Sequence, residues 1–280
     1  MPLEPMPYFD FLLDKLAGND EAVATSFGRH VHWGYWQDPA AAICDTPDYG
    51  RAAEQLTLQL CEMAEILPGQ QVLDVGCGFG GTVASLNERL DGMRLAGLNI
   101  DDRQLQRAQA LVKPFHDNFI AFCRGDACAL PFANASQDRL LAVECIFHFP
   151  SRKLFFKEAS RVLKPGGILA LSDFVPSPLF LPVAAVFGSA SWFGKFNYFG
   201  HCDVRYTVSR YRRLATEAGL MPHRERNITA HTLPTYRYIK HLLGDATTFA
   251  GRSASGLINL LNSLGRLRLL NYYLLAFRKP

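Results

Sequence analysis

The feature that most constrains this chain is a glycine-rich loop, VLDVGCGFGG, at residues 72–81. An apolar run leads into Gly76, Gly78 and Gly80, and a helical pattern follows. Glycine is needed where the backbone turns sharply or where a ligand must approach it closely. Gly76, Gly78 and Gly81 also fit the GxGxxG spacing of dinucleotide folds, so the spacing alone leaves the ligand open.

Around this loop, short apolar runs alternate with helical patterns. Such alternation predicts βαβ crossovers, and therefore an α/β fold with a mostly parallel sheet that helices cover on both faces. The expected strands are residues 71–75, 93–98, 119–125, 139–144, 167–174 and 271–279. The expected helices include residues 51–66, 82–90, 103–112, 152–163 and 207–218, and a helical pattern also covers 8–30.

The alternation predicts two parts of unequal size. Residues 1–66 form an N-terminal helical cover, and residues 67–280 form the α/β domain. After the fifth strand the alternation lapses, and residues from about 176 to 206 are rich in Phe, Pro and Gly. This composition favours an apolar lid inserted after the fifth strand.

The composition excludes several classes of protein. Hydrophobic residues make up 49% of the chain and charged residues 20%, which excludes a wholly disordered protein, and a net charge of +3 is too small for a general nucleic-acid binder. The seven cysteines include no CxxC pair and favour free thiols in a reducing compartment. The N-terminus lacks the basic segment of a signal peptide, and the most apolar stretch, residues 179–187, is too short to span a membrane. We therefore expect a cytoplasmic protein without a transmembrane segment.

Asp74, two residues before the first loop glycine, bears on the identity of the ligand. A carboxylate there would repel a pyrophosphate and would attract a ligand that carries an amine and a sulfonium centre. S-adenosylmethionine has both cationic groups and no phosphate. The loop contains no Lys or Arg, and the GxxxxGK[ST] pattern is absent, which disfavours a P-loop. A strand-to-helix turn without a ligand is the alternative.

Five motifs then follow in order: DVGCGFG (74–80), GLNID (97–101), GDACALPF (125–132), ECIFHFPSR (144–152) and VLKPGGILALSDF (162–174). Together they resemble the class I methyltransferases that use S-adenosylmethionine. The subgroup they resemble most is that of small-molecule enzymes, which includes sugar, quinone, sterol and terpenoid O- and C-methyltransferases. The resemblance covers roughly residues 30–175. It implies a Rossmann-like sheet of seven strands.

The resemblance also implies which residues bind the cofactor. Asp74 matches the acid near the methionine amine, and Gly76 and Gly78 match the backbone that passes beneath the cofactor. Asp126 and Ala127 match the pair that reads the adenine edge, with a solvated turn as the alternative for Asp126.

The ribose position departs from the family pattern, because the usual acid is replaced by Asn99. Asparagine can accept one hydrogen bond through its amide oxygen, but without charge assistance. Asp101 can compensate or, alternatively, cap the following helix, and Gln104 can reach the ribose or the methionine end. The remaining cofactor contacts that the resemblance implies are Tyr35, Ile100 and Val143, with core packing as an alternative for the neighbouring Trp36.

Methyl transfer to a hydroxyl requires aligned groups and a base. The loop after the fourth strand contains Glu144 and His148, which would face the methyl group in this fold. We expect His148 to be the base, because the ordinary pKa of an imidazole, about 6.5, lies close to working pH. Asp173 would orient it through the other ring nitrogen. Packing of His148 on Phe147 and Phe149 is the alternative.

Glu144 supports a second hypothesis, methylation of an isoprenoid or aromatic carbon with this carboxylate as base. Aromatic rings can stabilise a cationic intermediate, and the predicted lid is rich in them. Such a lid favours a bulky hydrophobic or aromatic acceptor, with packing alone as the alternative. Its aromatic residues are Phe180, Phe187, Trp192, Phe193, Phe196, Tyr198, Phe199 and Tyr206.

The leading hypothesis is thus an S-adenosylmethionine-dependent methyltransferase for a hydrophobic small molecule, with oxygen slightly ahead of carbon as the acceptor atom and with a homodimer as a further expectation. His30 and His32 lack a third ligand at suitable spacing, so no metal is expected. One rival is an S-adenosylmethionine-binding protein or cyclase that moves no methyl group. An NAD-dependent dehydrogenase is disfavoured by Asp74 and Asn99.

Overall fold

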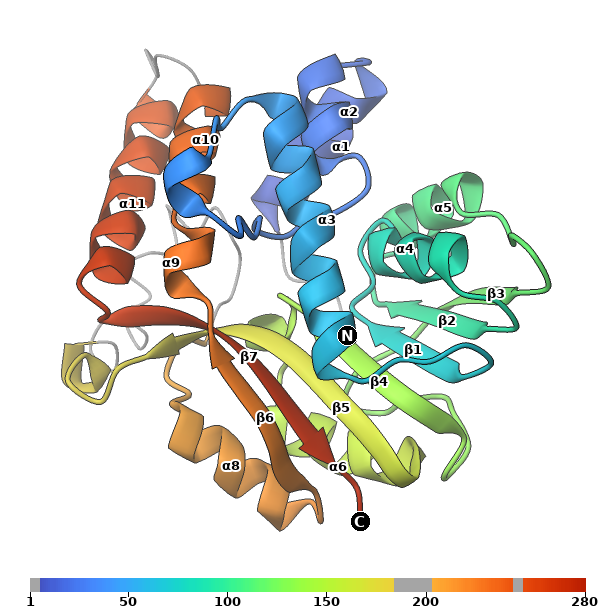
Figure 1. Ribbon diagram of the computed structural model, residues 1–280. Coiled ribbons are helices and arrows are strands. Elements are labelled where there is room, and N and C mark those ends of the chain that lie inside the picture. Colours follow the sequence, from blue (N-terminus) through green and yellow to red (C-terminus); the bar gives the residue numbers. More distant parts are fainter. Residues whose placement is uncertain (1–5, 184–202, 244–248) are drawn as a thin grey trace.

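A sheet of seven strands forms the centre of the protein, and helices lie on both of its faces (Figure 1). The structure, a computed structural model, describes residues 6–183, 203–243 and 249–280. The strands are β1 (Gln71–Val75), β2 (Arg94–Asn99), β3 (Phe119–Arg124), β4 (Gln137–Val143), β5 (Leu163–Pro176), β6 (Met221–Asn227) and β7 (Leu270–Arg278). The α-helices are α1 (Pro7–Ala17), α2 (Glu21–Phe27), α3 (Thr46–Met63), α4 (Gly81–Arg89), α5 (Asp102–Leu111), α6 (Arg152–Val162), α8 (Val208–Glu217), α9 (Thr229–Thr232), α10 (Pro234–Leu243) and α11 (Phe249–Arg266). Two short 3-10 helices are η1 (Pro39–Ala41) and η2 (Ile146–His148).

The strand order confirms the fold expected from the sequence. The order across the sheet is β3-β2-β1-β4-β5-β7-β6. Strands β1 to β5 pair in parallel, whereas β7 runs antiparallel to both β5 and β6. The chain moves outward in one direction from β1 and in the other from β4, so the edge beyond the carboxyl ends of these two strands is the place where such sheets bind ligands.

The strands are buried on both faces, which explains why the sequence shows continuous apolar runs. Neighbouring residues of a strand point to opposite faces. Leu73 and Leu169 belong to the core beneath α6 and α8, whereas Val72 and Ile168 belong to the core beneath α3 and α4. The sheet is therefore enclosed by two separate hydrophobic layers.

Most expected elements are present, and the differences have local causes. The helical pattern over 8–30 is divided into α1 and α2 because Asn19 adopts a left-handed conformation and Asp20 caps α2. Strand β6 escaped the sequence analysis because it is an edge strand whose residues are mainly polar and largely exposed. Strand β5 begins at Leu163, earlier than the expected start at residue 167, and contains Gly166 at a φ of 77°.

The N-terminal helices lie over the same face of the sheet as α10 and α11 (Figure 1). Helix α3 contacts β4, β5 and β7, and α2 packs on α3. The segment after α2 also presses on the start of α4, since a Cβ atom added at Gly81 would lie 2.5 Å from both the Arg29 carbonyl oxygen and His30 Nδ1. Division of the chain after residue 66 stays a prediction.

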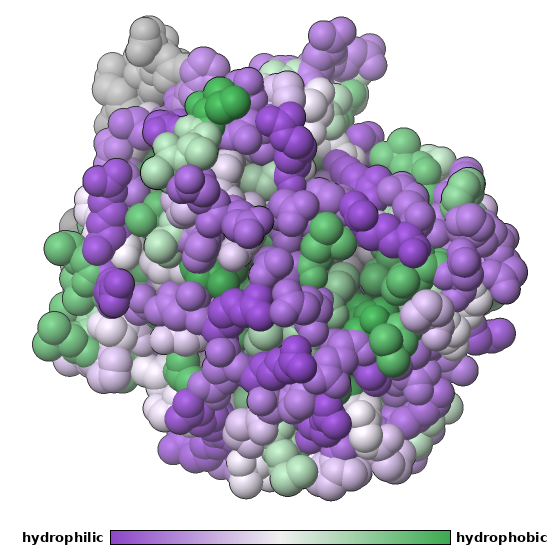
Figure 2. All heavy atoms as spheres, viewed as in Figure 1, coloured by the Kyte–Doolittle hydropathy of each residue, from purple (hydrophilic) through white to green (hydrophobic). Residues whose placement is uncertain are grey.

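The surface seen in Figure 2 is mainly hydrophilic, with hydrophobic residues in small separate groups. Among the helices of the described ranges, none has the length and apolar character that crossing a bilayer requires.

The core beneath α6 and α8 yields a stability prediction. The ring of Phe156 is fully buried and lies 5.4 Å from the ring of Phe277, centre to centre. We expect Phe156→Ala to lower the free energy of unfolding by about 3–5 kcal/mol, because a cavity remains between the sheet and α6. The control Phe115→Ala removes a ring that is 55% exposed and should change that free energy by about 0.5 kcal/mol or less. If chemical denaturation showed the same loss in the free energy of unfolding for both variants, the packing role of Phe156 would be contradicted.

Candidate active site

The glycine loop turns sharply at the carboxyl end of β1. Gly76 and Gly78 have φ angles of 74° and 54°, in the left-handed region that favours glycine. A Cβ atom at Gly76 would lie 2.7 Å from Cβ of Cys145, which follows β4. At Gly78 the nearest atom would be Gln104 Oε1, at 4.0 Å, so this part of the backbone is open to a ligand. The loop thus joins β1 tightly to β4 while leaving Gly78 accessible.

Asp74, near the end of β1, is a buried carboxylate. Only 2% of the residue is exposed, and both carboxylate oxygens lack a hydrogen-bond partner among the described residues. Burial raises the pKa of Asp74 to about 7, and the nearby Thr82 hydroxyl lowers it in part without reaching hydrogen-bond geometry. A buried carboxylate in this state is stabilised by a cation. The amino group expected for the cofactor fits this requirement.

Asn99 and Gln104, the residues expected near the ribose, lie together. Asn99 Nδ2 donates to Gln104 Oε1 at 3.0 Å, and Asn99 Oδ1 accepts the backbone N–H of Ile100 at 2.7 Å. Both side chains are buried, whereas Ile100 is 40% exposed. Asp101 caps α5 by accepting the Arg103 N–H at 2.9 Å, which confirms the capping alternative. Asn99 Oδ1 also accepts the Asp101 backbone N–H at 3.2 Å, and the Gln104 side chain interacts with the Asp101 carboxylate, so a ribose would meet side chains that already bind one another.

The other expected cofactor residues are spread around the same edge of the sheet. Asp126 is exposed in the turn after β3, where it accepts the Cys128 N–H at 2.8 Å, and Ala127 is buried beside it. Val143 ends β4 in the core. Tyr35 is partly buried, and its ring stacks on His231 with centroids 4.7 Å apart. The cofactor roles of Asp126, Ala127, Val143 and Tyr35 therefore stay predictions.

Trp36, beside Tyr35, is a core residue. It is 7% exposed, and its indole N–H donates to Asp48 Oδ2 at 2.8 Å.

Glu144, the first residue after β4, combines an unusual backbone with a buried carboxyl group. Its φ angle is 50°, which costs energy for a residue with a side chain and is common at functional sites. Oε2 accepts the Trp33 backbone N–H at 2.9 Å and the Tyr272 hydroxyl at 2.6 Å. The residue keeps some exposed surface, but protein surrounds the carboxyl group, and burial raises its pKa to about 8. Near neutral pH most of this group is therefore protonated.

His148 and Asp173 both lie at this edge of the sheet, on η2 and near the end of β5. The ring of His148 lies 4.4 Å from that of Phe147 and 6.4 Å from that of Tyr8, centre to centre. Asp173 is fully buried: Oδ2 accepts Arg152 Nη2 at 3.0 Å and the Tyr211 hydroxyl, and burial raises its pKa to about 6.

The groups that hold the carboxyl groups of Glu144 and Asp173 were not among the residues predicted from the sequence. Arg152 closes the ECIFHFPSR motif and could have been found there as the cation for Asp173. Tyr211 and Tyr272 come from α8 and β7, and no motif marks either of them. Trp33 contributes a backbone N–H, which no side-chain pattern can reveal.

The expected lid falls mainly outside the described residues, as do six of its eight aromatic residues. The described end of this segment, from residue 203 onward, packs against the site: Arg152 Nη2 donates to the Asp203 carbonyl oxygen at 2.7 Å, and its guanidinium lies 4.0 Å from the centre of the Tyr206 ring. In the described ranges, no group of three or more His, Cys, Asp or Glu residues could hold a metal ion.

Comparison with known proteins adds a family match. Residues 73–171 match the family described as "Methyltransferase domain". The 27-O-demethylrifamycin SV methyltransferase of Amycolatopsis mediterranei is 32% identical over 268 residues, which cover 91% of each chain. Methyltransferase GfsG of Streptomyces halstedii is 38% identical over 157 residues, so the match spans 56% of this chain and only 55% of that relative.

A solved structure shares the fold. The [4+2]-cyclase SpnF superposes with a TM-score of 0.72 at 22% sequence identity, covering 98% of this chain and 94% of that one. At this identity the likeness extends to the architecture alone.

The unpaired carboxylate yields a binding prediction. We expect Asp74→Asn to weaken S-adenosylhomocysteine binding about a hundredfold, because the ligand's amine loses a buried charge partner. In the unaltered protein, affinity should fall by up to about tenfold per pH unit below pH 7, since the proton on Asp74 must leave before the cation binds. The Asn variant should lose this part of the pH dependence. Calorimetry between pH 5.5 and 8.5 measures both effects.

The control is Asp91→Asn, which alters a carboxylate whose side chain is 72% exposed and should leave affinity unchanged. Unaltered affinity in Asp74→Asn would remove Asp74 from the cofactor site.

Proposed function

This chain belongs to the S-adenosylmethionine-dependent methyltransferases, and on that premise we propose that it transfers a methyl group to a hydroxyl oxygen of a hydrophobic small molecule. The main support is the match with the rifamycin SV enzyme, because it covers nine tenths of both chains and that relative is named for an O-methylation. The match with GfsG covers about half of each chain and supports only the broader class.

We propose that different residues along this edge of the sheet bind different parts of the cofactor. S-adenosylmethionine supplies an electrophilic methyl group. Asp74 would hold its amine, Gly78 would allow close approach of the backbone, and Asn99 with Gln104 would meet the ribose. Tyr35, Ile100, Asp126, Ala127 and Val143 complete the proposed cofactor contacts.

We propose that His148 takes the proton from the acceptor hydroxyl. It follows β4 at the same sheet edge as Glu144, whose carboxyl group would contact the substrate as an auxiliary acid. Asp173 would act as a positioning residue: with Arg152 it links the end of β5 to Asp203, whose backbone N–H donates to the Phe147 carbonyl at 3.0 Å. This arrangement would fix the backbone next to His148.

Carbon methylation with Glu144 as base is the second candidate, and one observation favours it. The rings of Trp33, Phe174, Tyr236 and Tyr272 form one connected group with neighbouring ring centres 4.6–5.6 Å apart, and the Tyr272 hydroxyl of this group donates to Glu144 Oε2. Such rings stabilise a cation.

A protein that binds S-adenosylmethionine without methyl transfer remains a rival, which the absence of S-adenosylhomocysteine in every acceptor reaction would support. The family assignment leaves no support for a dehydrogenase. A small hydrophobic acceptor rather than a nucleic acid, a cytoplasmic location and a homodimer stay predictions.

The proposed base yields a kinetic prediction. His148→Asn keeps the size of the side chain but cannot accept a proton at working pH, so we expect kcat to fall by about 10²–10⁴. Affinity for S-adenosylhomocysteine should change less than twofold. The measurement is release of S-adenosylhomocysteine in the presence of hydroxylated hydrophobic acceptors. An undiminished kcat would exclude His148 as base.

The variant Glu144→Gln distinguishes methyl transfer to oxygen from methyl transfer to carbon. For transfer to oxygen we expect a loss of about tenfold or less, because Gln keeps the polar contact; for transfer to carbon the loss should approach that of a missing base, about 10²–10⁴. Mass spectrometry of the product made with an isotopically labelled methyl donor identifies which atom carries the methyl group.

A further inference from the structure

A polar chain outside the cofactor site runs from α3 and α4 to the carboxyl group of Glu144. Its last step is the hydrogen bond from the Trp33 backbone N–H to Glu144 Oε2, at 2.9 Å. The second donor to that oxygen is the Tyr272 hydroxyl, at 2.6 Å. The carboxyl group is therefore held between one residue of the last strand and one backbone group of the N-terminal cover.

The backbone around Trp33 is fixed on several sides. The His32 carbonyl accepts the Tyr49 hydroxyl at 2.9 Å, the Gly34 N–H donates to Thr235 Oγ1 at 3.1 Å, and the Trp33 carbonyl receives a contact from His32 Nδ1 at 2.9 Å. Trp33 itself is 6% exposed. The position of its N–H thus depends on side chains from α3 and α10.

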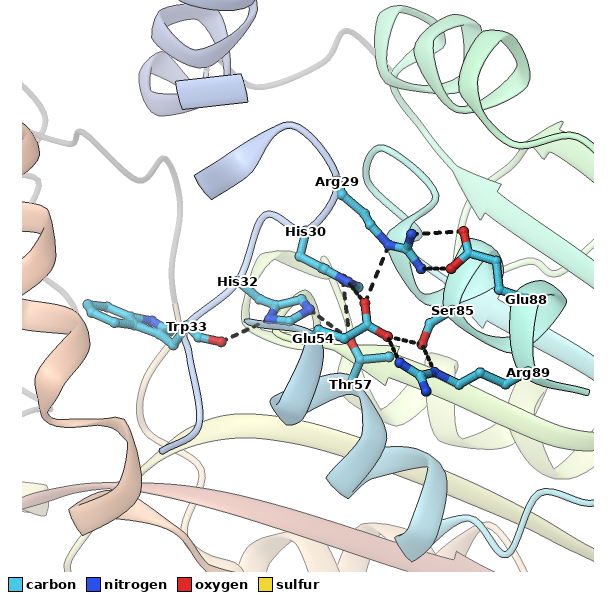
Figure 3. Close-up of polar contacts among 9 residues, drawn as sticks. All are labelled: Arg29, His30, His32, Trp33, Glu54, Thr57, Ser85, Glu88 and Arg89. Atoms are coloured by element: carbon cyan, nitrogen blue, oxygen red, sulfur yellow. Dashed lines mark hydrogen bonds and ion pairs between the residues drawn. The ribbon is translucent and has the colours of Figure 1, made fainter. Parts of the chain in front are cut away.

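Figure 3 shows how the contact at His32 continues into the protein. His32 Nε2 lies 3.1 Å from Thr57 Oγ1, and Thr57 Oγ1 lies 3.3 Å from His30 Nδ1. His30 Nε2 in turn lies 2.8 Å from Glu54 Oε2. Glu54 is anchored by Arg89 and by the Ser85 hydroxyl, both on α4.

The donor and acceptor roles in this series of hydrogen bonds follow from the groups at its two ends, the Trp33 carbonyl and the Glu54 carboxylate. A carbonyl can only accept, so His32 Nδ1 must carry a hydrogen; a carboxylate can only accept, so His30 Nε2 must carry one. Burial lowers the pKa of His30 and lowers that of His32 to about 3, so both rings are neutral near pH 7 and their other nitrogens are acceptors. Thr57 has one hydroxyl proton for these two acceptors, and the shorter contact is to His32. A hydroxyl proton donated by Thr57 to His32 Nε2 therefore favours the same tautomer of His32, the one whose Nδ1–H binds the Trp33 carbonyl.

From this geometry we infer that Trp33 is a positioning residue for Glu144, held in place by the Thr57 hydroxyl through His32. The inference rests on the proposed function only in that Glu144 takes part in the reaction. The Trp33 N–H stabilises the ionised carboxylate, so its displacement should raise the pKa of Glu144.

The titratable groups that face Glu144 are Asp173, Tyr272, Tyr236, Tyr49 and Cys145. The tyrosines and the cysteine have pKa values raised by burial, and Asp173, at about 6, is ionised above pH 7. Asp74 lies at the same edge of the sheet with a pKa of about 7, so the part of the titration that disappears in Glu144→Gln is the part that reports Glu144.

The test is Thr57→Val, which keeps the shape of the side chain and removes the hydroxyl. With ¹⁵N-labelled tryptophan, the backbone amide of Trp33 should titrate near pH 8 in the unaltered protein and should not titrate there in Glu144→Gln. In Thr57→Val we expect the midpoint to rise by about half a unit or more, and kcat to fall about tenfold. In the Glu144→Gln background the further loss in kcat should be smaller.

Two controls separate positioning from general stability. Thr57→Ser restores a hydroxyl and should return the midpoint and kcat to their original values. Thr232→Val removes another buried helical hydroxyl, one that donates to the Thr229 carbonyl at 3.0 Å, and should leave both unchanged.

An unchanged Trp33 titration in folded Thr57→Val would overturn the inference, as would an equal shift in Thr232→Val. If Thr57→Val does not fold, failure of Thr57→Ser to preserve the titration would overturn it equally. The amide titration needs no methyl acceptor, so it tests the inference even if the proposed transfer to a hydroxyl fails.

Discussion

Three buried carboxyl groups lie at one edge of the sheet, near the ends of β1, β4 and β5, because parallel strands bring their carboxyl ends to the same edge. Burial raises their pKa values, to about 7 for Asp74, 8 for Glu144 and 6 for Asp173. Their contribution to stability is therefore fully present below about pH 4, where the unfolded chain also binds these protons, and is lost as the pH rises through 6, 7 and 8. Arg152 offsets the free-energy cost of ionising the buried Asp173, and a bound amine would offset the same cost for Asp74.

Much of this edge could be predicted from local sequence. The loop glycines have backbone angles that other residues rarely adopt, and Asp74 follows from its place in a buried strand beside them. The alternation of apolar runs located the five strands that pair in parallel, together with the final strand β7. These features depend on residues close together in the chain, so short motifs record them.

What escaped prediction depends on contacts between distant residues. Glu144 receives its hydrogen bonds from positions 111 residues before it and 128 residues after it, and one of the donors is a backbone N–H. Asp173 was expected to orient His148, yet its described partners include Arg152 and Tyr211, from α6 and α8. Strand β6 lacks an apolar pattern because only one of its edges is paired.

The close packing of Gly81 against Arg29 and His30 has a consequence for protein engineering. Even a methyl group at Gly81 would collide with the Arg29 carbonyl oxygen and the His30 ring. The start of α4 and the segment after α2 therefore have to keep their positions relative to each other. A chimera that takes the segment after α2 from one homologue and α4 from another would have to transplant both surfaces together. Exchanging segments between such enzymes thus requires that the packing between these two segments be matched.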